Sequence, residues 1–250
     1  MHTVPELLIY GHRASFAVWK RRPQDIIRVY CTEERMSDYR DLLKLCAQEK
    51  KAYHLVTDAE LRKITDSVHH EGVALLVRLQ KSLQESEFFE EIRHAKTPSP
   101  LIFTDGVSNP HNLGAMSRTM AHFGARYLIG DKTELPKMSA SWTRLSEGGM
   151  EFVTLVEVRS KPEFLGQLKK QGYSIIGLSS HARQSIYKTE LPQKAIFVLG
   201  NEITGMSDEV TRALTQRLVI PGTGAVASLN VSVASAICLS EWARTHKSKA

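Results

Sequence analysis

Short apolar runs alternate with helical stretches along most of this 250-residue chain. In the second half the runs LIFTDGV, RYLIG, YSIIGL, AIFVLG and RLVIPG are separated by segments that suit helices, such as NLGAMSRTMAHFGA and EFLGQLKKQ. This alternation indicates layers of helices around a mostly parallel sheet. We therefore expect an α/β fold.

One change in composition divides the chain. Residues 81–99, KSLQESEFFEEIRHAKTPS, are mostly charged or polar and contain Pro98 just before a second proline, Pro100. Because helix is disfavoured in the residue before a proline, we interpret this stretch as an interdomain helix and linker. The sequence thus predicts a small α/β domain at 1–80, a linker at 81–99 and a second α/β domain at 100–250.

Charge and cysteine content limit the class of protein. A formal net charge of +6 is consistent with an anionic partner such as RNA. The cysteines are odd in number and form no C-x-x-C, so neither a disulfide framework nor a metal site is expected. The start, MHTVPELLIYGHRAS, does not read as a signal peptide, and the run VSVASAICL is too short to span a membrane. We expect a cytoplasmic protein that binds no membrane.

Three loops of the second domain combine strand ends with polar residues. They are SNPHNLGAMSRTMAHFGA, with Asn112 and Arg118, FVLGNEITGM, with Glu202, and RLVIPGTGAVASLN, with Ser228 and Asn230. Ligands of open α/β sheets bind beyond the carboxyl ends of the strands, and Glu202 falls there. Taken singly, Asn112 reads equally well as a helix cap, Arg118 as a solvated helix residue and Glu202 as an exposed loop acid.

The third loop also fits the dinucleotide pattern G-x-G-x-x-A between Gly222 and Ala227. That pattern requires a strand, a glycine turn, a helix and then a second strand. The printed sequence has room after Gly222 for one helix only, so we do not expect an enzyme that uses NAD or FAD. The helix expected from Ser228, SLNVSVASAICLSEW, carries small residues on one stripe, which permits close approach of a ligand or a second helix.

In this order the three loops resemble motifs 1, 2 and 3 of the SpoU, or TrmH-like, branch of the SPOUT RNA methyltransferases, over residues 100–245. The resemblance implies a trefoil-knotted domain that binds a bent S-adenosylmethionine (AdoMet), methylates a ribose 2′-OH of RNA and forms a homodimer. It places the following residues in the catalytic site: Asn112, Arg118, Glu202, Ser228 and Asn230. It assigns cofactor contacts to Leu178, Leu199, Gly200, Ile220 and Leu229.

The first domain resembles the L30e-like substrate-binding domain of ribosomal RNA 2′-O-methyltransferases, through LIYGHRASFAVW and HHEGVALLV. The resemblance implies an RNA-binding role and favours ribosomal over transfer RNA. Four cations near the first helix suit phosphate contacts: Arg13, Lys20, Arg21 and Arg22. The alternatives are a methyltransferase acting on transfer RNA, a base-methylating relative and a non-catalytic RNA-binding protein that retains the knot. Two residues depart from the family pattern, Glu147 and Gly222.

Overall fold

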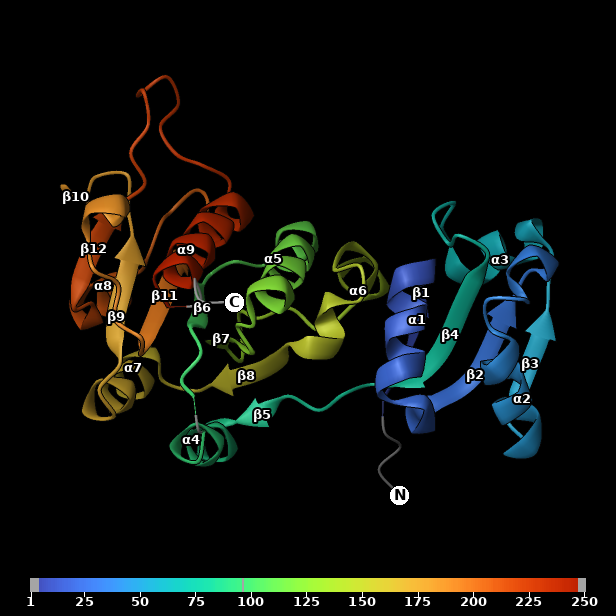
Figure 1. The fold of residues 1–250 in the computed structure, drawn as a ribbon. Coiled ribbons are helices and arrows are strands. Elements are labelled where there is room, and N and C mark those ends of the chain that lie inside the picture. The colour runs from blue at the N-terminus through green and yellow to red at the C-terminus, as the bar shows by residue number, and fades with distance from the viewer. Residues whose placement is uncertain (1–4, 96, 247–250) are drawn as a thin grey trace. The chain divides into compact units, whose positions relative to one another are not determined.

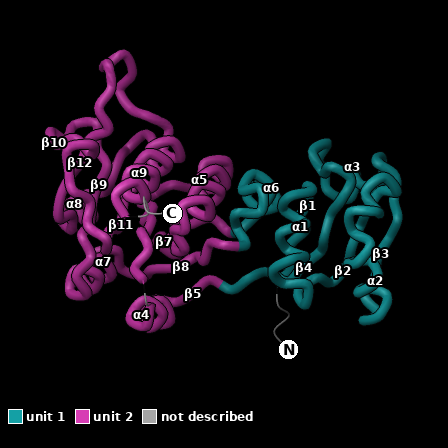
Figure 2. The backbone as a smooth tube through the Cα atoms, viewed as in Figure 1, with its two compact units in different colours: residues 1–81, 138–151 teal, residues 82–137, 152–250 magenta. Residues whose placement is uncertain are grey.

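The structure is a computed structural model that describes residues 5–95 and 97–246 (Figure 1). The chain divides into two compact units, shown in teal and magenta in Figure 2. Unit 1 contains residues 1–81 and 138–151, and unit 2 contains residues 82–137 and 152–250. The backbone therefore crosses between the units after Lys81, Lys137 and Glu151. Residues 1–4, part of the stretch expected not to be a signal peptide, lie outside the described residues.

Unit 1 is built on a four-stranded sheet with the order β1-β4-β2-β3. Strands β2 and β3 are parallel, whereas β4 runs antiparallel to both β1 and β2. Buried apolar residues of α1 and α2 pack with those of the strands to form the main core. The elements are β1 (Glu6–Tyr10), α1 (His12–Arg21), β2 (Ile26–Cys31), α2 (Arg40–Gln48), β3 (Ala52–Leu55), α3 (Asp58–Thr65), β4 (Val73–Arg78) and α6 (Ala140–Leu145).

The placement of residues 138–151 in unit 1 differs from the predicted boundary, which assigned them to the second domain. Two contacts explain the difference. Helix α6, whose Trp142 is fully buried, packs against β1 and α1, and the carboxylate of Glu151 receives two hydrogen bonds from the Arg22 guanidinium, at 2.7 and 3.0 Å. Glu147, which departs from the family pattern, forms an ion pair with Arg13 at 3.3 Å. This segment thus belongs to unit 1 by packing although it lies within the second half of the sequence.

Unit 2 contains an eight-stranded sheet with the order β10-β12-β9-β11-β6-β7-β8-β5. Every pair of neighbouring strands in this sheet is parallel, which confirms the predicted α/β fold with a parallel sheet. The elements are β5 (Leu83–Gln84), α4 (Glu85–Arg93), β6 (Leu101–Asp105), α5 (Pro110–Phe123), β7 (Tyr127–Asp131), β8 (Thr154–Val158), α7 (Lys161–Lys170), β9 (Ser174–Leu178), β10 (Gln184–Ser185), β11 (Ala195–Gly200), α8 (Asp208–Ala213), β12 (Gln216–Val219) and α9 (Val231–His246).

Helices cover both faces of the unit 2 sheet. Helices α4, α7 and α8 share one apolar core with alternate residues of the strands. The intervening strand residues, such as Ile102 and Phe197, point to the opposite face, and α5 and α9 pack against each other (Figure 1). The stretch 81–99, expected to be an interdomain helix and linker, contains the helix α4, whose Phe88 and Phe89 are buried in the core that α4 shares with α7 and α8.

Candidate active site

The carboxyl ends of four neighbouring parallel strands define one edge of the unit 2 sheet. Strand β12 lies beside β9, β9 beside β11 and β11 beside β6. The loops that follow these strands therefore leave the sheet at the same edge, where ligands of open α/β sheets bind. All three of the loops singled out in the sequence begin there, after β6, β11 and β12.

One side chain from each loop takes part in a continuous set of hydrogen bonds. The Asn112 side-chain amide donates to the carboxylate of Glu202, a residue 90 positions later in the chain. Asn230 Nδ2 donates to Asn112 Oδ1 at 2.9 Å, across 118 positions. The structure thus brings Asn112, Glu202 and Asn230 together at the carboxyl edge.

Local structure frees Asn112 for this contact. Helix α5 is capped by Asn109, whose side-chain oxygen accepts from the backbone N–H of His111 at 2.9 Å, and Pro110 occupies its first turn. Asn112 is therefore not the cap of α5, the alternative that its position in the sequence left open. Its amide oxygen and nitrogen both serve the contact with Asn230 and Glu202.

Asn230 lies at the start of the last helix, which begins at Val231 and not at the expected Ser228. Its Oδ1 accepts from the Ser232 backbone N–H at 2.9 Å, as a cap does. It also accepts from Ser232 Oγ at 2.6 Å. With its oxygen held by the helix, the Nδ2 group of Asn230 is directed toward Asn112.

Arg118 and Ser228 stand apart from this set. Both residues are exposed, Arg118 on α5 and Ser228 in the loop before α9. Within residues 5–95 and 97–246, no hydrogen bond or ion pair joins either side chain to Asn112, Glu202 or Asn230. Both side chains are therefore open to solvent and available to another molecule.

The expected cofactor residues lie at the ends of β9, β11 and β12. Leu178 ends β9, Leu199 and Gly200 end β11, Ile220 follows β12, and Leu229 is exposed in the loop beyond. A Cβ at Gly200 would lie 2.4 Å from the carbonyl carbon of Gly205. The approach is close because the Asn201 and Gly205 backbones hydrogen-bond to each other in both directions.

Apolar side chains of two of these loops face solvent. They are Ile203, after β11, and Val226 and Leu229, after β12. Exposed apolar side chains of this kind fit the flat apolar face of an adenosine. The residues present are therefore compatible with a nucleoside cofactor such as AdoMet.

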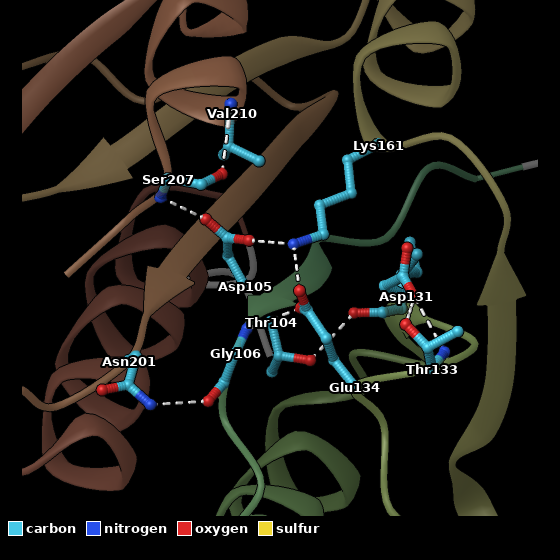
Figure 3. Close-up of polar contacts among 11 residues, drawn as sticks. Thr104, Asp105, Gly106, Asp131, Thr133, Glu134, Lys161, Asn201, Ser207 and Val210 are labelled. Atoms are coloured by element: carbon cyan, nitrogen blue, oxygen red, sulfur yellow. Dashed lines mark hydrogen bonds and ion pairs between the residues drawn. The ribbon is translucent and has the colours of Figure 1, made fainter. Parts of the chain in front are cut away.

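A buried ion cluster, which sequence reasoning missed, anchors the loop that carries Glu202 (Figure 3). The Asp105 carboxylate accepts from Lys161 Nζ and from the Ser207 backbone N–H, both at 2.6 Å. Lys161 also donates to Glu134 at 2.5 Å. At the other end of the loop, Asn201 Nδ2 donates to the Gly106 carbonyl at 2.8 Å.

The charge of Lys161 is maintained by its partners. Burial by itself favours the neutral amine, but the hydrogen bonds and negative charges of Asp105 and Glu134 outweigh that effect and raise the pKa of Lys161. Asp105 ends a buried strand at the carboxyl edge, a position that could have identified it in the sequence. Nothing in the sequence around Lys161 separates it from the exposed lysines of α7.

The structure contradicts one of the four predicted RNA contacts, that of Arg22. Its side chain is buried, bonded to Glu151 and to the Arg78 carbonyl, so it offers no group to a phosphate. Arg13, Lys20 and Arg21 are exposed. Lys20 Nζ lies 3.8 Å above the ring of Trp19.

The described residues offer neither a cluster of metal ligands nor a membrane-spanning helix. In the described part of the chain, no group of three or more His, Cys, Asp or Glu residues could hold a metal ion. No helix of residues 5–95 and 97–246 is long and apolar enough to cross a membrane.

A parallel α/β unit with three polar loops at one edge defines the class of protein, and comparison with known families identifies it. Residues 99–240 match the SpoU rRNA Methylase family, and residues 8–83 match the family described as RNA 2′-O ribose methyltransferase substrate binding. The chain therefore belongs to the SpoU methylase family, which confirms the resemblance found in its loops.

Individual relatives cover nearly the whole chain. It is 33% identical over 242 residues to YfiF of Escherichia coli O157:H7, an uncharacterized tRNA/rRNA methyltransferase, covering 97% of this chain and 69% of that protein. It is 32% identical over 240 residues to the 23S rRNA (guanosine-2′-O-)-methyltransferase RlmB of Vibrio vulnificus, covering 94% of this chain and 96% of that protein. A related Haemophilus influenzae methyltransferase is matched over 66% of its length.

Solved structures share the fold. The SpoU methyltransferase AviRb from Streptomyces viridochromogenes, in complex with AdoMet, superposes with a TM-score of 0.79 over 97% of this chain and 91% of that chain, at 19% identity. An RNA 2′-O ribose methyltransferase superposes with a TM-score of 0.78 over 98% and 90%, at 21% identity. At these identities the likeness establishes the fold alone.

Proposed function

We propose that this protein transfers the methyl group of AdoMet to a ribose 2′-OH of ribosomal RNA in the cytoplasm. The contact among Asn112, Glu202 and Asn230 carries the proposal, because these are the residues that the SpoU motifs assign to catalysis. The names of the RlmB relatives favour ribosomal RNA over transfer RNA. We further propose that the loops after β9, β11 and β12 form the trefoil knot of the SPOUT fold.

The residues that the SpoU motifs assign to catalysis have separate roles in the proposed reaction. When bound, AdoMet supplies a methyl group already activated by its sulfonium. The O–CH3 bond would form as the S–CH3 bond breaks, and the 2′-OH proton would leave to solvent. The protein must therefore align the ribose and stabilise the negative charge on the 2′-oxygen as that proton leaves. Asn112, Glu202 and Asn230 orient the ribose and the loops, and the exposed Ser228 precedes Asn230 by two residues in the third loop. Arg118, a permanently charged guanidinium, stabilises the oxygen, a role that we favour over proton abstraction by an arginine whose basicity is altered by a substrate phosphate.

Calorimetric titration tests the cofactor assignment. We expect the full-length protein to bind AdoMet and its demethylated product, and to bind neither NAD nor FAD. Gly200→Ala should weaken AdoMet binding, because its Cβ would collide with the backbone of Gly205. Gly166→Ala in α7 is the matched control, since a Cβ there meets nothing within 4 Å. Binding of a dinucleotide in place of AdoMet would contradict the proposal.

Charge removal in unit 1 tests RNA recognition. Lys20→Gln combined with Arg21→Gln should weaken binding of ribosomal RNA and reduce the slope of log affinity against log salt by roughly 0.7–0.9 for each phosphate that the variant no longer neutralises. Lys169→Gln combined with Lys170→Gln removes the same charge from α7 of unit 2, at the opposite end of that helix from Lys161. Equal loss of affinity in both double variants would show that unit 1 does not select RNA.

A homodimer is supported by an apolar hollow of ≈ 510 Å³ on unit 2. Ala115, Thr119 and Phe123 of α5 line it, with Val233, Ala236 and Ile237 of α9. Arg118 lies one turn beyond Ala115 on the exposed side of α5. A second copy seated on this hollow would therefore bring its surface close to Arg118, consistent with catalytic sites near the interface.

Sedimentation at micromolar concentration should give twice the 28.1 kDa mass of the chain. Val233→Asp should convert the dimer to monomer, because this partly exposed valine would place a charge in the interface. Val68→Asp alters an exposed valine of unit 1 and should leave the dimer intact. A monomeric unmodified protein would contradict the proposed assembly.

A further inference from the structure

The outer side of helix α1 carries an aromatic surface that the SpoU motifs do not include. Phe16 is 36% exposed and Trp19 is half-buried, one turn further along the helix. The core-facing side of α1 is formed by other residues, Ala14, Ser15 and Val18. Trp19 packs against the edge of this core, whereas Phe16 belongs to neither group and is exposed.

Contacts with the buried residue Tyr39 hold the rings of Phe16 and Trp19 in place. The rings of Phe16 and Trp19 are edge to face, with centroids 5.2 Å apart. Trp19 also contacts Tyr39, with centroids 5.9 Å apart, and the Tyr39 hydroxyl donates to the His12 carbonyl at 2.9 Å. Because Tyr39 is fully buried, the exposed rings rest on a fixed base. A rigid surface loses little conformational entropy when a ligand binds.

Positive charge lies directly beside the rings. The Lys20 ammonium is 3.8 Å from the centroid of Trp19 and 5.2 Å from that of Phe16. Two carboxylates near Tyr39 are engaged by other groups, since Glu71 accepts from the His12 backbone N–H and Asp38 pairs with Arg35. Within residues 5–95 and 97–246, no ion pair joins Lys20 to a carboxylate, so an anion that approaches Phe16 meets the Lys20 ammonium.

An aromatic ring next to a cation matches one chemical unit in particular, an unpaired nucleotide, whose base stacks and whose phosphate pairs with the ammonium. A duplex offers the phosphate but keeps its bases stacked inside. We infer that Phe16, Trp19 and Lys20 form a stacking site for an unpaired nucleotide of the RNA substrate. The inference rests on the proposed RNA-methylating function and adds that unit 1 recognises a single-stranded loop or bulge.

Tryptophan fluorescence provides a local readout in the full-length protein. The other two tryptophans, Trp142 and Trp242, are at most 2% exposed, so quenching by a stacked base reports on Trp19. We expect an unstructured RNA decamer to quench the emission to saturation. The same sequence in a duplex should quench weakly, and an abasic oligomer of equal charge should not quench.

Phe16→Ala should weaken affinity for the single strand by roughly five-fold to one hundred-fold, the effect of removing one stacking partner. Phe16→Tyr should retain the affinity because it retains the ring. Tyr53→Ala removes an exposed aromatic residue from β3 of the same unit and is the matched control. Thermal melting of Phe16→Ala shows whether the variant is folded, and Lys20→Gln tests the phosphate contact independently of the ring.

The outcomes separate this inference from the proposed function. Equal affinity of Phe16→Ala and the unmodified protein, or equal quenching by duplex and single strand, would overturn the stacking site while methyl transfer persists. Binding of no RNA at all, with AdoMet bound normally, would overturn the proposed function instead. If Phe16→Ala and Tyr53→Ala lose affinity equally, the surface is not specific and the inference is wrong.

Discussion

Replacing Arg118 by alanine should lower the turnover of methyl transfer by roughly two to three orders of magnitude, the effect of removing one donor to a developing oxyanion. The affinity for AdoMet should stay nearly unchanged, because Arg118 lies on α5 while the expected cofactor loops follow β9, β11 and β12. An interaction made only in the transition state affects turnover and not ground-state binding. Single-turnover transfer of labelled methyl groups to ribosomal RNA measures the first quantity, and calorimetry measures the second.

Two further arginine variants sharpen this test. Arg118→Lys keeps a positive charge without the planar donors and should recover part of the lost turnover. Arg126 is an exposed arginine that lies shortly after the end of α5 and pairs with Glu91. The turnover of Arg126→Ala should equal that of the unmodified protein. Normal turnover in Arg118→Ala would show that Arg118 has no role in catalysis.

The sequence predicts the site well where spacing and strand order suffice. Asn112, Glu202 and Asn230 follow three strands whose carboxyl ends share one edge, so a parallel sheet must bring them close. Their mutual hydrogen bonds could not be predicted, because the roles of Asn109 and Asn230 as helix caps decide which amide groups are available. Asn109 relieves Asn112 of capping, and only the structure shows this.

Charged residues are harder to interpret from sequence. Arg21 and Arg22 are adjacent in the chain, yet the first is exposed and the second is buried against Glu151, 129 positions later. Asp105 and Lys161 are 56 positions apart. A local pattern does not reveal a partner at such separations. A run of basic residues can therefore contain both exposed residues that are available to RNA and buried residues that pair within the protein.

The domain boundary illustrates the same limit. Trp142 and Glu151 belong to unit 1 because their partners lie there, whereas the sequence motifs on either side belong to unit 2. Separating the chain at the predicted linker would remove β1 and α1, against which α6 packs, and would remove Arg22, the partner of the Glu151 carboxylate. Substitutions in the full chain are therefore better tests of unit 1 than its removal.

Lys161→Met should destabilise the protein by about 3–5 kcal/mol, the usual result of removing one partner from a buried ion pair. Among the residues that the structure describes, the variant leaves the buried Asp105 carboxylate without a counter-charge, while the Ser207 backbone N–H still donates to it. Because Asp105 and Gly106 anchor both ends of the loop that carries Glu202, affinity for AdoMet should fall as well. Lys169→Met, an exposed position on the same helix, should change stability by no more than about 0.5 kcal/mol.

A double-mutant cycle attributes the loss to the ion pair. In the Asp105→Asn background the Lys161→Met substitution should cost less than in the unmodified protein, since no buried carboxylate is left unpaired. The pH dependence has a defined sign: the raised pKa of Lys161 means that its contribution persists through neutral pH and is lost only as pH rises above the ordinary lysine value of about 10.4. Urea unfolding between pH 7 and pH 11 measures this. Equal unfolding free energies for Lys161→Met and Lys169→Met at pH 7 would show that the cluster does not stabilise the fold.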